Sequence, residues 1–141
     1  MRAQLLVVDD DANIRELAEL HLGAAGYAVR VAKDGVAAGY AVLESAPDLI
    51  LCDKEMPHMT GLEFVAALRA DTTIPRMPVL FLTSSDDDAD YTPHGVAETL
   101  EKPLRVDVLL AAVSRHLSPR SALADYLAPR APKLEGSEPC V

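Results

Sequence analysis

The sequence predicts an α/β fold in which a doubly wound, five-stranded parallel sheet carries helices on both faces. Apolar, strand-sized runs alternate with helical patterns five times along the chain. Most runs are continuously apolar, as in strands that are buried on both faces, and no hairpin signal joins two of them. Because crossovers between parallel strands are right-handed, only two architectures are possible, a doubly wound open sheet and a barrel. Five strands are too few for the eight-stranded barrel, so the open sheet is predicted.

The predicted strands are short, and most of them are rich in Leu, Val and Ile. They are Gln4–Asp9, Tyr27–Ala32, Asp48–Asp53, Val79–Thr83 and Ala97–Glu101. Helical patterns fill the intervals and follow the last strand, and they predict Asn13–Ala24, Asp34–Ser45, Thr60–Ala70 and Leu104–Leu117.

Local signals set the ends of these helices. Gly26 is expected to end the first helix, because glycine tolerates the positive φ of a helix C-terminus. Pro47 prevents the second helix from continuing. Thr60 and Glu63 form the pattern of a capping box, which starts the third. The apolar side of the first helix is formed by Ile14, Leu17, Leu20 and Ala24, with Ala18 and His21 as the alternative to Leu20.

The composition changes at Ser118, and we place the boundary of the folded domain there. Residues 1–117 form the predicted domain, and residues 118–141 form a C-terminal tail or linker that is punctuated by four prolines. Within this tail, Ser121–Leu127 could form one short helix.

Charge and composition exclude several classes of function. Residues 1–117 hold 19 acidic and 10 basic residues and so carry the whole net charge of −9. Such an acidic body argues against direct binding of nucleic acid, whose affinity depends on neutralising phosphates. No apolar run has the length of a membrane span, so we expect a soluble protein without membrane contact. Two cysteines and no secretory leader point to the cytoplasm.

Polar residues stand where the predicted strands end. Asp9, Asp10 and Asp11 follow the first strand, Asp53 ends the third, Thr83 ends the fourth, and Lys102 follows the fifth. In a parallel sheet these positions share one edge. Crowded carboxylates need a compensating cation, and Mg²⁺ prefers hard oxygen ligands and phosphate. Beside such a cation an Asp can act as a nucleophile on phosphorus.

Four stretches in order resemble the landmarks of response regulator receiver domains. They are Leu5–Asp11, Asp53–Gly61 with its Asp-x-x-Met-Pro-x-Met-x-Gly pattern, Val79–Ser84, and Lys102-Pro103. The resemblance covers residues 4–117 and implies a flavodoxin-like sheet of order 2-1-3-4-5.

The resemblance also implies a role for each residue. Asp53 would accept the phosphoryl group. Asp10 would ligate Mg²⁺ directly, Asp9 through water, and Glu55 through its backbone carbonyl. Asp11 would lie next to these ligands without contacting the ion. Thr83 would move toward the phosphoryl group, Lys102 would form a salt bridge with it, and the Lys102-Pro103 bond would be cis.

The family also implies the partners. The phosphodonor would be a histidine kinase or a histidine phosphotransfer protein, and the output would go to a downstream protein, with a homodimer left open. Such a domain catalyses its own phosphorylation and dephosphorylation and acts on no separate substrate.

Two features depart from the family. The segment Ser84–His94 is short, holds four Asp and Pro93, and offers few apolar residues, so we predict a loop or a single turn where the family has its fourth helix. Thr99 stands where the family usually has the aromatic residue that moves with the Thr. We therefore expect an atypical output face, with activation either ordering this segment or being read elsewhere.

Three other readings remain open. The acidic run Asp9–Asp11 could merely cap the following helix. Asp9 and Asp11 could belong to a phosphatase of the haloacid-dehalogenase kind, although Asn13 does not fit that motif and Asp53 is left unexplained. The chain could also be a pseudo-receiver that binds partners without phosphorylation.

Overall fold

A five-stranded parallel sheet forms the centre of the protein. A computed structural model describes residues 2–84 and 89–127. The strand order is β2-β1-β3-β4-β5, and every neighbouring pair is parallel. The strands are β1 (Gln4–Val8), β2 (Ala28–Ala32), β3 (Leu49–Asp53), β4 (Val79–Thr83) and β5 (Glu98–Glu101). The predicted fold class is thus confirmed, with strand ends within one residue of the expected positions.

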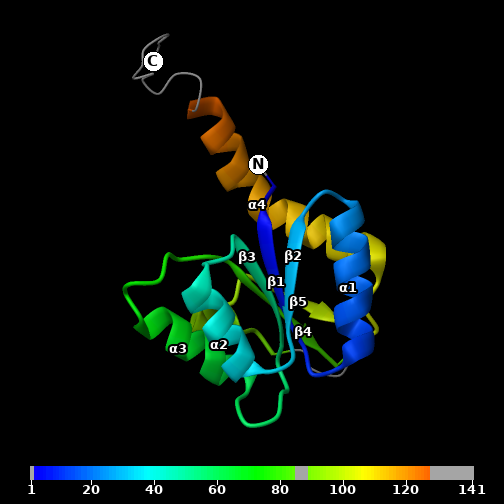
Figure 1. Ribbon diagram of the computed structural model, residues 1–141, viewed down its shortest axis with the longest axis vertical. Coiled ribbons are helices and arrows are strands. Elements are labelled where there is room, and N and C mark those ends of the chain that lie inside the picture. Colours follow the sequence, from blue (N-terminus) through cyan, green and yellow to red (C-terminus); the bar gives the residue numbers. More distant parts are fainter. Residues whose placement is uncertain (1, 85–88, 128–141) are drawn as a thin grey trace.

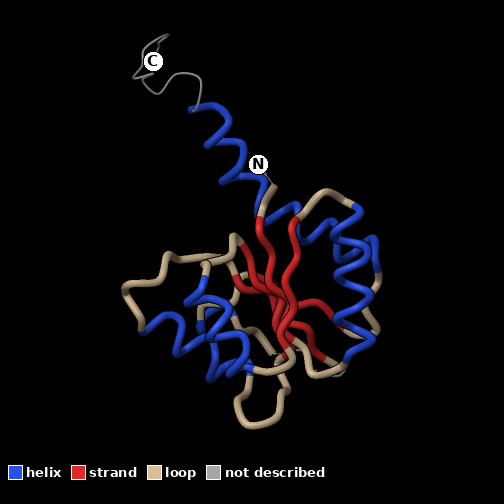
Figure 2. The backbone as a smooth tube through the Cα atoms, viewed as in Figure 1, coloured by secondary structure: helices blue, strands red, loops and turns tan. Residues whose placement is uncertain are grey.

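Helices cover both faces of this sheet, as Figures 1 and 2 show. On one face lie α1 (Ala12–Ala24) and α4 (Val106–Leu127), and on the other lie α2 (Gly35–Glu44) and α3 (Gly61–Ala70). Figure 1 has α1 to the right of the sheet and α2 and α3 to its left, while α4 starts at the right and extends toward the upper left. None of the described helices combines the length and the apolar character that a membrane crossing requires.

Successive side chains of each strand point to opposite faces of the sheet, so the core has two halves, one on each face. Leu6 and Val8 of β1 pack toward α2 and α3, whereas Leu5 and Val7 pack toward α1 and α4. All four side chains are fully buried. Burying a side chain of this size contributes about 1.5–3 kcal/mol, so this two-sided burial explains the continuous apolar run in the sequence.

The predicted helix ends are found in the structure. Thr60 caps α3, and its Oγ1 accepts from the amide of Glu63 at 3.2 Å while the Glu63 carboxylate accepts from the Thr60 amide at 2.9 Å. Asp34 caps α2 through the amide of Ala37. Gly26 follows α1 with a φ of 103°, the conformation that made glycine the expected residue there.

The structure decides between the two predicted alternatives for the apolar side of the first helix. In α1 the buried residues are Ala18 and Leu22, whereas Leu20 is 66 % exposed. The apolar side therefore follows the alternative through Ala18, and Leu20 faces solvent. Small and large apolar residues occur all round this helix, so the period alone did not determine which side meets the sheet.

The segment between β4 and β5 has the predicted form where the structure describes it. A single 3₁₀ turn at Thr92–His94 stands in place of a full helix, and Gly95 ends it with a φ of 89°. Three of its four aspartates, Asp86–Asp88, lie outside the described residues. The preceding Tyr91 is buried, at 9 % exposure, and anchors this turn to the domain, whereas residues 89, 90 and 92–94 are exposed.

The C-terminal helix is longer than predicted. The sequence suggested one helix ending at Leu117 and another over Ser121–Leu127, but α4 is continuous from Val106 to Leu127. Proline lacks one backbone donor and crowds the carbonyl four residues earlier, yet a long helix can accept it with a bend, and Pro119 lies within α4. The domain boundary at residue 117 remains a prediction.

A charged cluster ties α4 to β5. Arg115 Nη2 lies 2.7 Å from Glu98 Oε2, and His116 Nε2 lies 2.7 Å from Glu98 Oε1. Burial alone would raise the pKa of Glu98, but the Arg115 and His116 contacts outweigh it and lower that pKa. The carboxylate is thereby held in its charged form at the base of the helical extension.

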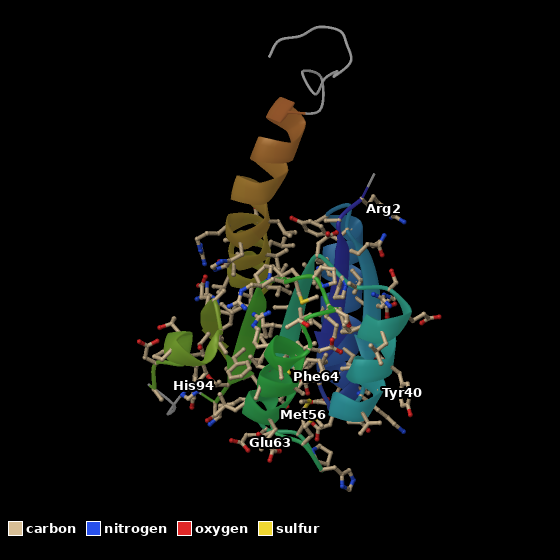
Figure 3. All side chains as sticks on the ribbon, turned by 90° about the vertical axis from the view of Figure 1, so that its left-hand side faces the viewer. Arg2, Tyr40, Met56, Glu63, Phe64 and His94 are labelled. Atoms are coloured by element: carbon tan, nitrogen blue, oxygen red, sulfur yellow. The ribbon has the colours of Figure 1, made fainter. Side chains whose placement is uncertain are left out.

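An apolar groove of about 410 Å³ lies between α2 and α3. Tyr40, whose position on α2 is labelled in Figure 3, borders it and is 72 % exposed. Phe64 of α3, also labelled there, is buried. The groove contains none of the predicted site residues.

Candidate functional site

Polar side chains collect at the carboxyl edge of the sheet, as their strand-end positions predicted. Asp9 follows β1, Asp53 ends β3 and Thr83 ends β4, three neighbouring strands. All three are buried, with Asp9 fully inaccessible. Buried carboxylates and hydroxyls are costly without partners, so their conjunction here marks a site rather than ordinary strand ends.

Lys102 brings the two buried aspartates together. Its Nζ lies 3.1 Å from Asp9 Oδ2 and 3.4 Å from Asp53 Oδ1. Its backbone amide donates to the Thr83 carbonyl at 2.7 Å, which fixes it beside the end of β4. The Lys102-Pro103 bond is cis, as predicted.

Electrostatics at this edge favour added positive charge. Burial, and then the nearby Asp9 carboxylate, raise the pKa of Asp53 to about 6 despite the opposing effect of Lys102. Burial lowers the pKa of Lys102, but its contact with the Asp9 carboxylate, followed by that with Asp53, leaves that pKa raised overall. One ammonium thus compensates two carboxylates incompletely, which is the condition that a bound cation relieves.

The donor set fits Mg²⁺. Carboxylate oxygens of Asp9, Asp10 and Asp53 lie within 4.8 Å of one another. Asp9 Oδ2 and Thr83 Oγ1 are buried, and neither has a hydrogen-bond partner in the part of the chain that the structure describes, although Asp9 Oδ2 makes its ionic contact with Lys102. Asp10 is exposed at the mouth. Hard oxygens with unused lone pairs beside solvent match an ion that keeps several waters.

Asp11 has a different place from its two neighbours. Its carboxylate accepts from the Asn13 amide at 2.8 Å and caps α1, as the alternative reading of the acidic run proposed. Its own amide donates to Asp9 Oδ1 at 2.9 Å. Asp11 therefore orients Asp9 through the backbone while its side chain serves the helix.

The loop after β3 holds Asp53 in place. The amide of Glu55 donates to Asp53 Oδ1 at 3.2 Å, and the amide of Lys54 donates to the Leu82 carbonyl at 3.0 Å. The end of the loop packs closely against the end of β3 at Gly61. Glycine is needed there because a Cβ would lie 2.9 Å from the Asp53 carbonyl oxygen. The Glu55 carboxylate is largely exposed, and the ligand role of its carbonyl remains a prediction.

Two residues near the site were not singled out by the sequence. Lys54 Nζ donates to the Tyr91 hydroxyl at 3.1 Å, lies 5.3 Å from the centre of its ring, and is 3.1 Å from Glu55 Oε2. Tyr91 in turn packs edge-on against Phe81 of β4. The available signal was one aromatic residue in an otherwise polar segment.

The comparisons with known proteins agree with this geometry. A model of the response regulator receiver domain matches residues 5–114. The response regulator MtrA of Mycobacterium tuberculosis, strain H37Rv, described as DNA-binding, is 36% identical over 120 residues, which are 83% of this chain and 51% of MtrA. MprA of Mycobacterium sp., strain KMS, is 36% identical over 125 residues, 84% of this chain and 54% of MprA. The chain thus spans about half the length of these relatives.

Solved structures give the same assignment. The chemotaxis response regulator CheY4 of Vibrio cholerae aligns with a TM-score of 0.77 and 34% identity, over 83% of this chain and all of CheY4. NtrX of Brucella abortus aligns with a TM-score of 0.80 and 26% identity, over 98% of this chain and 32% of NtrX. With the family matched over most of the chain, and with the same fold in its relatives, this protein belongs to the response regulator receiver domain family of two-component signalling.

Proposed function

We propose that Asp53 accepts a phosphoryl group from a histidine kinase or a histidine phosphotransfer protein, with Mg²⁺ held by Asp9, Asp10, Asp53 and the Glu55 carbonyl. The observation that carries the proposal is the Lys102 ammonium, which contacts Asp9 and Asp53 at 3.1 Å and 3.4 Å beside the buried Thr83 hydroxyl, an oxygen without a hydrogen-bond partner in the described chain. The phosphatase reading is set aside, since the chain belongs to another family.

The chain's own residues divide the chemistry between them. The Asp53 carboxylate is the nucleophile, and the Glu55 amide at 3.2 Å orients its Oδ1. Lys102 neutralises charge on the transferred phosphoryl oxygens, and the Thr83 hydroxyl donates to one of them. When bound, Mg²⁺ supplies further neutralisation of that charge. Asp9 is kept in position by the Asp11 amide and by Lys102.

Loss of the phosphoryl group belongs to the same site. Glu55 places an exposed carboxylate two residues beyond the phosphoacceptor, at the mouth of the site. We expect Glu55→Ala to change the rate at which the acyl phosphate is hydrolysed, because this carboxylate can either repel phosphate or orient the attacking water. The protein thereby catalyses its own phosphorylation and dephosphorylation.

The output face is proposed to be atypical. A single 3₁₀ turn precedes β5, and Thr99 offers no aromatic ring beside it. Because the buried Tyr91 already anchors the turn at Thr92–His94, activation has less of the described segment to order than its polarity suggested. The net charge of −9 favours a protein partner over nucleic acid for this domain, whereas the DNA binding in MtrA's description is a property of that longer protein.

A mass measurement tests the proposal. The chain is incubated with acetyl phosphate and Mg²⁺ and analysed by intact-mass spectrometry, beside Asp53→Asn. We expect one added phosphoryl group on the wild type and none on the variant. A label that persists in Asp53→Asn would refute the assignment. An unlabelled wild type would favour a pseudo-receiver, the alternative suggested by Thr99 in place of the usual aromatic residue.

A further inference from the structure

Lys54 joins two loops that flank the phosphoacceptor edge. It follows Asp53 directly in the chain, and its backbone amide is fixed to the Leu82 carbonyl of β4. Its side chain crosses to the segment before β5, where Nζ donates to the Tyr91 hydroxyl at 3.1 Å. The Lys54 side chain is only 21 % exposed, and the partners of its ammonium include the Glu55 carboxylate. It is therefore a partly buried cation held close to a site whose charge is proposed to change.

Tyr91 fixes the segment before β5. Its ring is buried and lies 5.4 Å from the Phe81 ring, at an interplanar angle of 60°. Phe81 stands two residues before Thr83 on the same strand. The Tyr91 carbonyl accepts from the amides of His94 and Val96, which form the turn that leads into β5. A change at the Tyr91 side chain would thus be transmitted to this turn.

Phosphorylation would place a competing partner on Asp53, the residue that precedes Lys54 in the chain. A phosphoryl group adds negative charge and three strong acceptor oxygens to Asp53. A hydrogen bond from an ammonium to an anion is stronger than one to a neutral hydroxyl, and the partly buried position limits screening by water. The Tyr91 hydroxyl is therefore the weaker competitor for Lys54.

We propose that Lys54 and Tyr91 form a contact sensitive to phosphorylation, in which the phosphoryl group on Asp53 draws the Lys54 ammonium away from Tyr91 and loosens the turn before β5. The proposal rests on the function proposed for Asp53. Tyr91 then acts as a positioning residue for the output segment, and Lys54 carries the change in charge to it.

The test follows the Tyr91 ring and the adjacent turn in one experiment. The full chain is labelled with 3-fluorotyrosine, and the Tyr91 ¹⁹F resonance is assigned by its loss in Tyr91→Phe. Beryllofluoride with Mg²⁺ serves as the phosphoryl analogue, and its own bound ¹⁹F signal reports occupation of the site. In the wild type we expect the Tyr91 resonance to shift and the His94 and Val96 amides to exchange several-fold faster on occupation.

Three variants make the test specific. Lys54→Met should remove the response of Tyr91 while beryllofluoride still binds, whereas Lys54→Arg, which keeps a cationic donor, should retain it. Lys33→Met removes one exposed lysine elsewhere and should respond like the wild type.

The outcomes separate the two proposals. Bound beryllofluoride with an unmoved Tyr91 resonance, or with an unchanged response in Lys54→Met, would overturn this inference and leave the function of Asp53 intact. Absence of bound beryllofluoride in the wild type would overturn both.

Discussion

The Lys102 ammonium lies 3.4 Å from the Asp53 carboxylate, and this contact joins the start of the loop after β5 to the end of β3. The same ammonium is 3.1 Å from Asp9, so it serves two carboxylates at once. A single cation shared in this way leaves each carboxylate partly uncompensated. Most of the behaviour that we expect of the site follows from this deficit of positive charge.

Replacing Lys102 by Met should slow phosphorylation of Asp53 by about 10²–10³-fold, the usual cost of removing one preorganised charge-stabilising group. Lys102 also holds down the pKa of Asp53, so its loss should raise that pKa further and make the defect larger at pH 6, where more of the nucleophile is protonated, than at pH 8. Rates of phosphoryl incorporation from acetyl phosphate measure both effects. A variant that is labelled at the rate of the wild type would show that Lys102 is structural.

Asp53→Asn should stabilise the metal-free protein at neutral pH. The pKa of Asp53 is raised from 3.8 to about 6, so ionisation costs folding free energy, and this cost grows as the pH rises through that interval. The gain at pH 7 should be about 1–2 kcal/mol, less than the shift alone implies, because the site borders solvent. It should fade as the pH falls below 3.8, where the carboxyl is mainly protonated in both states.

Denaturant unfolding of the two proteins in EDTA, at pH 7 and near pH 3.5, measures this gain. Added Mg²⁺ should then stabilise the wild type more than the variant, and so narrow the difference. A wild type that is the more stable protein in EDTA at pH 7 would contradict the argument.

Asp10→Ala and Asp11→Ala should differ sharply, although the two residues are adjacent. Asp10 belongs to the cluster whose oxygens lie within 4.8 Å, and its loss should nearly abolish phosphorylation. The Asp11 side chain caps α1, so its loss should cost about 1 kcal/mol of stability and leave most of the phosphorylation. Phosphoryl labelling and denaturant unfolding of both variants measure these effects. If both variants lost labelling to the same extent, the metal ligands would be misassigned.

Gly61→Ala should disturb the site through the backbone. The new Cβ would lie 2.9 Å from the Asp53 carbonyl oxygen and 3.0 Å from the Lys54 Cα, neither of which can move without displacing the loop. We expect a loss of about 1–3 kcal/mol and slower phosphorylation. Gly39→Ala is the matched control, because a Cβ at this position in α2 meets nothing within 4 Å and should be neutral or stabilising.

The sequence allowed the sheet and the strand-end residues to be predicted because both depend on local pattern. Continuous apolar runs required burial on both faces, and parallel strands placed Asp9, Asp53 and Thr83 at one edge. The chemistry of a hydroxyl and an ammonium beside a phosphoryl group suggested what Thr83 and Lys102 do, and the resemblance to receiver domains made their separate roles specific. Their assignment as functional residues remains to be tested by the variants above.

What the sequence did not reveal depends on contacts between distant segments. Lys54 and Tyr91 are far apart in the chain, and no periodicity joins them, so their hydrogen bond appears only once β4 lies between the two loops. Leu20 and Pro119 illustrate the weakness of local rules. The side of α1 that is buried depends on the sheet, and the penalty for a proline within α4 was too small to end that helix.

The continuation of α4 makes this helix a lever. From Leu117 to Leu127 it extends for about 15 Å at the rise of an α-helix, and Figure 1 shows this part standing clear of the sheet. A tilt of about 10° at its base would displace its far end by roughly 3 Å, given that length. The base is held by the clamp of Arg115 and His116 on Glu98 of β5, the strand that ends just before Lys102. A small shift of β5 would therefore be amplified into a larger movement at residue 127, and Pro119 would determine how much of that movement is absorbed by bending.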